Sequence, residues 1–169
     1  MSQPNGLAFD SAGNLYAANY FSSTIEKFTP GGVGSVFASS GLNNPVGLAF
    51  DSAGNLYAAN SGNSTIEKFT PGGVGSVFAS SGLNAPFGLA FDSAGNLYAA
   101  NYSTNAIEEF TPGGVGSVFA SSGLDIPHLL AFTDDAGVPL PLANTPEPAS
   151  VALLGLGALL LSGRRRLKA

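Results

Sequence analysis

The chain of 169 residues contains no cysteine, which excludes disulfide bonds and thiolate metal sites. Basic residues are almost as scarce. Residues 1–163 hold only Lys27 and Lys68 against eleven acidic residues, for a net charge of −9. Such a body has no basic face with which to neutralise phosphates, so we expect no nucleic acid partner. Packing then has to supply the stability that cross-links would otherwise provide.

Common catalytic constellations are missing as well. There is no Ser/His/Asp set, no glycine-rich phosphate loop and no zinc-ligand spacing. His128 is the only histidine, and it takes the position that Phe87 holds one repeat earlier, in a linker. We therefore expect no catalytic residues, no metal site and no cofactor.

What the sequence does have is repetition. Residues 6–128 are three copies of a 41-residue unit, at 6–46, 47–87 and 88–128. The first two copies differ at 5 positions, and the second and third at 9. A fourth copy starts at Leu129 and fades, so residues 129–145 are expected to be a decayed repeat and linker. A period of 20–50 residues indicates a solenoid, propeller or array.

Each unit is expected to contain four short strands. In the first unit these are residues 6–9, 14–18, 24–28 and 33–39, separated by turns rich in Gly, Pro, Asn and Asp. Glycine or proline about every ten residues argues against helix. Four strands in about 40 residues is typical of one β-propeller blade. The predicted fold class is all-β: three four-stranded blades of a partial propeller, then a linker and one C-terminal apolar helix.

The turn and second strand carry a recognisable motif. In the second unit it comprises Asp51, Gly54, Asn55, Leu56, Tyr57, Ala58, Ala59 and Asn60, with matches in all three copies. This pattern resembles the NHL-type propeller repeat. NHL repeats often have Arg or Lys before the following Ile, whereas this chain has Thr24, Thr65 or Ala106. That departure weakens the expectation of charged-ligand binding.

Three blades are too few for a closed ring of 4–8. Either further blades lie upstream, together with an N-terminal signal peptide, or two chains pair into a six-bladed ring. We expect the N-terminus to be incomplete. An open arc should expose Leu7, Phe9, Leu97 and Phe91 on its end blades and self-associate through them.

Several repeated polar residues have two interpretations. Asp10, Asp51 and Asp92 form either a calcium-binding ring or, as we expect, caps of their own turns. Asn19, Asn60 and Asn101 either bind ligand at one rim or, as expected, make local backbone hydrogen bonds. Glu26, Glu67 and Glu108, with Glu109 in place of a lysine, are predicted to lie on a solvated strand.

Tyr20, Phe21 and Tyr102 occupy the most variable loop. They are candidates for surface binding by stacking on sugars, and the alternative is a turn packed on its own blade.

The C-terminal residues form a three-part segment. Pro146, Glu147 and Pro148 precede a 15-residue apolar run, 149–163, which ends at Arg164, Arg165, Arg166 and Lys168. As a helix the run would be about 22 Å long, short of the roughly 30 Å bilayer core. Long arginine side chains extend a short span, and their position suits a cytoplasmic flank. We expect a transmembrane segment at 149–163, with a buried core helix as the alternative.

This order of elements resembles the PEP-CTERM sorting signal of Gram-negative bacteria. The resemblance covers residues 146–169 and implies export, retention in the inner membrane and processing by an exosortase. The implied function is an exported cell-envelope protein that binds or scaffolds in a surface or exopolysaccharide matrix, with surface polysaccharide or protein as partners. The alternative is a fragment of a propeller lyase or lactonase whose catalytic blades are missing.

Overall fold

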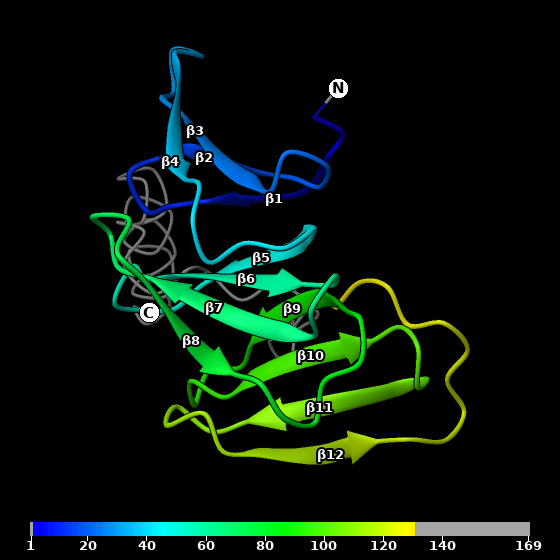
Figure 1. Cartoon of the computed structure of the whole chain (residues 1–169). Helices are drawn as coiled ribbons and strands as arrows, with labels where there is room; N and C mark the ends of the chain where they lie inside the picture. The colour runs from blue at the N-terminus through cyan, green and yellow to red at the C-terminus, as the bar shows by residue number, and fades with distance from the viewer. Residues whose placement is uncertain (1, 131–169) are drawn as a thin grey trace, which may run out of the picture.

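A computed structural model describes residues 2–130, which form three four-stranded antiparallel sheets, one per repeat (Figure 1). Blade 1 contains β1 (Pro4–Phe9), β2 (Leu15–Asn19), β3 (Thr24–Phe28) and β4 (Gly34–Ala38); blade 2 contains β5 (Pro45–Phe50), β6 (Leu56–Asn60), β7 (Thr65–Phe69) and β8 (Gly75–Ala79); blade 3 contains β9 (Pro86–Phe91), β10 (Leu97–Asn101), β11 (Ala106–Phe110) and β12 (Gly116–Ala120). The all-β prediction is confirmed. The helix predicted within 149–163 lies outside the described residues. Within residues 2–130, no helix has the length and apolar character needed to cross a membrane.

The first turn of each blade is held by its aspartate. Asp10 Oδ1 accepts hydrogen bonds from the backbone N–H of Ala12 (3.0 Å) and of Asn14 (2.8 Å), and Oδ2 accepts one from Asn14 Nδ2 (2.8 Å). Gly13, at φ 80°, closes the turn by donating its N–H to the Asp10 carbonyl. Asp51 and Asp92 repeat this geometry. The prediction that each aspartate caps its own turn is confirmed.

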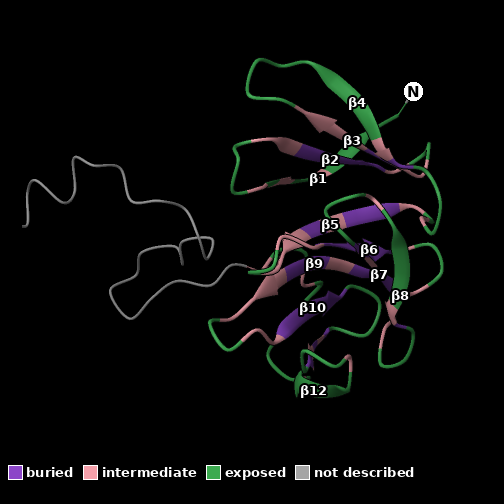
Figure 2. Ribbon diagram, turned by 90° about the vertical axis from the view of Figure 1, so that its left-hand side faces the viewer, coloured by how far each residue is buried: buried purple, intermediate pink, exposed green. Residues whose placement is uncertain are grey.

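The blades are arranged with their first strands side by side. β5 lies between β1 and β9, and the outermost strands β4, β8 and β12 are mostly exposed (Figure 2). A Cβ on Gly6 or Gly47 would overlap the carbonyl oxygen of Val46 or Phe87 on the next inner strand. Only glycine permits inner strands to approach this closely.

Adjacent blades bury apolar side chains between them. We call the face of a blade that meets the following blade its leading face, and the other its trailing face. Tyr16, Ile25 and Phe37 on the leading face of blade 1 pack against Phe50 and Phe69 on the trailing face of blade 2. The Tyr16–Phe50 and Phe37–Phe69 ring centroids are 5.0 and 6.1 Å apart in edge-to-face geometry, which aromatic pairs favour. Blades 2 and 3 repeat these contacts.

The prediction of which end residues are exposed was half wrong. Leu7 and Phe9 are 61% and 56% exposed, as expected. Leu97, however, is fully buried, and Phe91 packs in the second interface. Both lie on the trailing face of blade 3, which blade 2 covers. The uncovered face of blade 3 is its leading face, where Phe119 is 60% exposed.

Candidate binding surfaces

The variable loop of blade 1 presents two aromatic rings at one rim. Tyr20 and Phe21 follow β2 and pack edge to face at 5.1 Å. Phe21 is 65% exposed, whereas Tyr20 is partly covered, and its carbonyl accepts a hydrogen bond from Asn44 Nδ2. The loop therefore offers one free apolar ring supported by a second.

Blade 3 places a different aromatic group on its equivalent loop. Tyr102 stacks on Phe87, with centroids 4.9 Å apart and an interplanar angle of 24°. His128 contacts both rings, at 5.0 and 5.1 Å. Tyr102 is 37% exposed, so it is largely packed on its own blade. Blade 2 has Ser61 and Gly62 at the positions of Tyr20 and Phe21, so the two aromatic groups sit on separate loops.

The asparagines that end the second strands clamp the linker of the preceding blade. Asn60 Oδ1 accepts a hydrogen bond from the Asn43 backbone N–H (3.1 Å), and Asn60 Nδ2 donates to the Gly41 carbonyl (2.9 Å). Asn101 does the same with Asn84 and Gly82. The prediction that these asparagines bond to backbone groups is confirmed. The prediction that those groups are local in sequence was wrong, because they belong to the linker of the preceding blade. Asn19, which has no preceding blade within residues 2–130, donates a hydrogen bond from Nδ2 to Thr24 Oγ1 at 3.2 Å.

The prediction of a solvated third strand was wrong for Glu67 and Glu108. Each is only 5% exposed, because the preceding linker lies over it. A Cβ on Gly41 would lie 2.7 Å from Glu67 Oε1, and one on Gly82 would lie 2.5 Å from Glu108 Oε1. Burial raises the pKa of both carboxyl groups.

The third blade alters a repeated ionic cluster. In blade 1, Lys27 Nζ lies 3.7 Å from Asp10 Oδ2 and 5.2 Å from the Tyr16 ring centroid, and blade 2 repeats this with Lys68, Asp51 and Tyr57. In blade 3 Glu109 replaces the lysine and accepts a hydrogen bond from the Tyr98 hydroxyl at 3.0 Å. Burial, then the Glu109 carboxylate, raises the pKa of Tyr98 to about 12.

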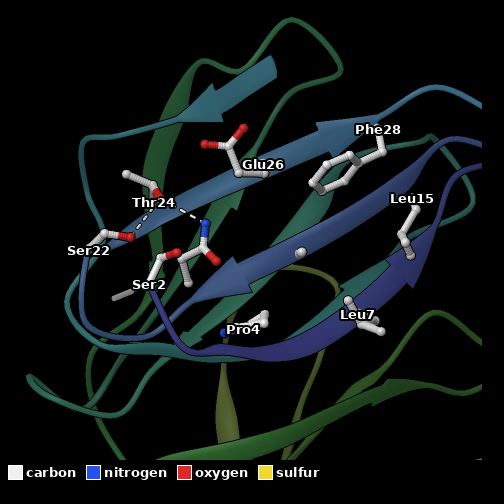
Figure 3. Close-up of a pocket in the computed structure, with 10 residues that line it drawn as sticks. Ser2, Pro4, Leu7, Leu15, Ser22, Thr24, Glu26 and Phe28 are labelled. Atoms are coloured by element: carbon white, nitrogen blue, oxygen red, sulfur yellow. Dashed lines mark hydrogen bonds between the residues drawn. The ribbon is translucent and has the colours of Figure 1, made fainter. Parts of the chain in front are cut away.

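The trailing face of blade 1 forms an open groove of about 750 Å³ (Figure 3). Leu7, Leu15 and Phe28 provide its apolar surface, and Asn19 and Glu26 lie at its polar part. The sequence predicted the exposure of Leu7 but not this groove. The sequence signal for the groove was the alternation along β2 and β3, which places Leu15, Ala17, Asn19, Thr24, Glu26 and Phe28 on the same side of the sheet.

Comparison with known families places two motifs on the chain. Residues 144–166 match the PEP-CTERM protein-sorting motif. Residues 42–69 match the NHL repeat. Both resemblances drawn from the sequence are thereby confirmed, and the PEP-CTERM motif marks the chain as an exported precursor that exosortase processes, in a Gram-negative bacterium. No curated protein matches the chain.

Solved structures share the fold. A nidogen/laminin complex matches with a TM-score of 0.72 and 25% identity, covering 79% of this chain and 54% of that one. Virginiamycin B lyase from Staphylococcus aureus matches with a TM-score of 0.69 and 15% identity, covering 79% and 47%. A streptogramin B lyase matches with a TM-score of 0.66 and 15% identity, covering 76% and 44%. The chain thus spans about half the length of these structures, and the lyase likenesses show the fold alone.

Proposed function

We propose that this chain is a binding or scaffolding protein of the cell envelope, which holds polysaccharide of the surface matrix through the aromatic loops at one rim. The observation that carries the proposal is where the repeats differ. The scaffold residues are nearly identical in all three blades, whereas the loop after the second strand changes in every copy and places the exposed Phe21 ring at the rim. An exposed aromatic ring stacks well on the apolar face of a sugar.

The sorting motif supports the same proposal from the other end of the chain. A precursor processed by exosortase leaves the cytoplasm, which would bring its body to the surface matrix as the proposal requires. The blades are nearly identical, and their main difference in ionisable groups is Glu109 in place of a lysine, a pattern that suits adhesion better than catalysis. Among residues 2–130, no three His, Asp or Glu side chains gather as a metal-binding group. The distant likeness to lyases is not evidence for enzymatic activity, since propellers host unrelated functions.

Affinity electrophoresis tests the proposal directly. The full chain would be run through gels containing purified bacterial exopolysaccharide, alongside Phe21→Ala, Tyr102→Ala and a Val33→Ala control. Val33 is 70% exposed but lies in the turn before β4. We expect retardation of the parent and the control, and weaker retardation of Phe21→Ala. Equal mobility of all variants with and without polysaccharide would contradict a sugar-binding rim.

A further inference from the structure

We propose that two copies of this chain associate head to tail: the leading face of blade 3 in one copy packs on the trailing face of blade 1 in the other. Each copy supplies both halves of the same interface. Two such contacts close a ring of six blades.

The apolar residues left exposed at the two ends are the ones buried between blades elsewhere. Leu7 is 61% exposed, while its equivalents Leu48 and Leu89 are 8% and 7% exposed. Phe28 is partly exposed at the open groove, whereas Phe69 and Phe110 are fully buried. At the other end Phe119 is 60% exposed, whereas Phe37 and Phe78 pack against the following blade. The free faces are therefore matching halves of an interface that the molecule already contains twice.

Polar groups at the two ends are complementary in the same way. Asn60 and Asn101 each clamp the linker of the preceding blade, and Glu67 and Glu108 lie under its glycine. Their equivalents Asn19 and Glu26 line the open groove. The matching glycine at the far end, Gly123, has open space where its Cβ would be. In the ring, Gly123 of one copy covers Glu26 of the other, and Asn19 donates to the Gly123 carbonyl.

One segment has to move for this contact to form. Residues 127–130 lie against Gly88, at the inner position that β1 of the second copy would occupy. They form no strand, and Leu129 is 89% exposed. Leu129 takes the place of Gly6, Gly47 and Gly88 in the repeat, and its side chain would prevent the close approach of a further inner strand. The incoming β1 carries the required Gly6, so residues 127–130 yield to it.

The symmetry of the contact explains why two copies suffice. A head-to-tail interface generates a ring if its rotation closes and a filament if it does not. Two arcs of three blades give six, within the 4–8 blades of closed propellers. The chain's span of 54% of the nidogen/laminin chain and 47% of the virginiamycin B lyase chain agrees with half a propeller.

Sedimentation velocity of the full chain tests the proposal, with mild detergent present throughout so that the apolar run at 149–163 does not drive association. Leu7→Glu disrupts one half of the interface and Phe119→Glu the other; both side chains are exposed in the single chain, so each variant should fold. We expect the parent to be a dimer and each variant to weaken dimerisation by about 100-fold or more, equivalent to at least about 2.7 kcal/mol. Val118→Glu is the matched control, because valines 36, 77 and 118 are 59%, 61% and 61% exposed whether or not a blade follows.

The decisive measurement mixes the two variants. A Leu7→Glu chain and a Phe119→Glu chain together retain one intact interface, formed by the unchanged Phe119 of the first and the unchanged Leu7 of the second. We expect an equimolar mixture to recover dimers that neither variant forms alone. A parent that stays monomeric up to its solubility limit would overturn the proposal and favour additional repeats in a longer chain as the occupant. A mixture that fails to dimerise would overturn the head-to-tail arrangement, as would single variants that associate like Val118→Glu.

Discussion

The same residue has different surroundings in successive blades, and Asn60 and Asn19 are the clearest pair. Both end a second strand and both contact the threonine five residues on. Only Asn60 has a preceding linker to clamp, through the Asn43 N–H and the Gly41 carbonyl. Since Asn60 is fully buried, its amide satisfies backbone groups that have little access to water.

Asn60→Ala is therefore expected to lower the free energy of unfolding by about 2 kcal/mol, because it leaves two linker groups unpaired. Asn19→Ala is the matched control and should cost less than about 1 kcal/mol, because it loses only the bond to Thr24. Both would be measured by urea denaturation in a Phe119→Glu background, which keeps association from contributing. Equal losses in the two variants would contradict the clamp.

Glu67 predicts a dependence of stability on pH. Burial raises its pKa in the folded state above the unfolded value, so the folded protein binds the proton more tightly. The stability that this group contributes is complete below the unfolded pKa of 4.5 and is lost as pH rises through the folded pKa. At pH values above the folded pKa the ionised, buried carboxylate destabilises the fold.

Glu67→Gln should consequently raise Tm at neutral pH, and its advantage should shrink toward about pH 4, where the parent carboxyl is protonated. Thermal melts of both proteins across that range provide the measurement. Glu26→Gln, at the partly exposed equivalent position, serves as the control and should change Tm less. An advantage for Glu67→Gln that is independent of pH would point to packing rather than desolvation.

At the scale of the element, the sequence was sufficient to predict the strands and turns, but not to predict which face of each strand is buried against a neighbouring blade. Glycine, proline and asparagine mark most of the connections, and the Asp10 turn is a local motif made with Ala12, Gly13 and Asn14. The surroundings of Leu97 and Glu67, in contrast, depend on the preceding blade and its linker. Period-2 patterning assigns residues to two faces of a strand, but cannot say which face meets the preceding blade. That assignment separates the buried Leu97 from the exposed Leu7.

Strand β11 also carries the one charge reversal in the array, at Glu109. Glu109→Lys should restore the Lys–Asp–Tyr cluster of the other blades. Tyr98 should then ionise at lower pH than its present value of about 12, because a hydrogen-bonded anion is replaced by a cation. The gain in stability should be no more than about 1 kcal/mol, since such pairs near the surface contribute little.

Ultraviolet titration of tyrosinate gives this shift, with Tyr98→Phe identifying the Tyr98 component among the five tyrosines. Glu109→Gln is the control: it removes the negative charge without adding a positive one, so its shift should be intermediate. The interpretation is wrong if Glu109→Lys and Glu109→Gln leave the titration of Tyr98 unchanged.

At the scale of the whole molecule, the body and the tail have opposite character. Residues 1–163 carry a net charge of −9 and the last six residues carry four basic side chains. The PEP-CTERM match at 144–166 includes the end of the acidic body and the three arginines of the tail. Its proline-flanked Glu147 precedes the apolar run, and the arginines follow it, an order that suits a segment halted in the inner membrane with its basic end in the cytoplasm.

Fractionation of the exported precursor tests that topology. The chain would be produced behind a cleavable export signal in a Gram-negative host without exosortase, so that processing does not remove the tail. We expect the parent in the inner-membrane fraction and a variant lacking residues 146–169 in the periplasm.

The matched control changes Arg164, Arg165 and Arg166 to glutamate, which keeps the apolar run but removes the cytoplasmic flank. Because acidic residues do not hold a segment on the cytoplasmic side, this variant should move substantially to the periplasm although its hydrophobic length is unchanged. Equal soluble fractions for all three proteins would show that the tail neither inserts nor anchors, and the apolar run would then have to pack within the folded body.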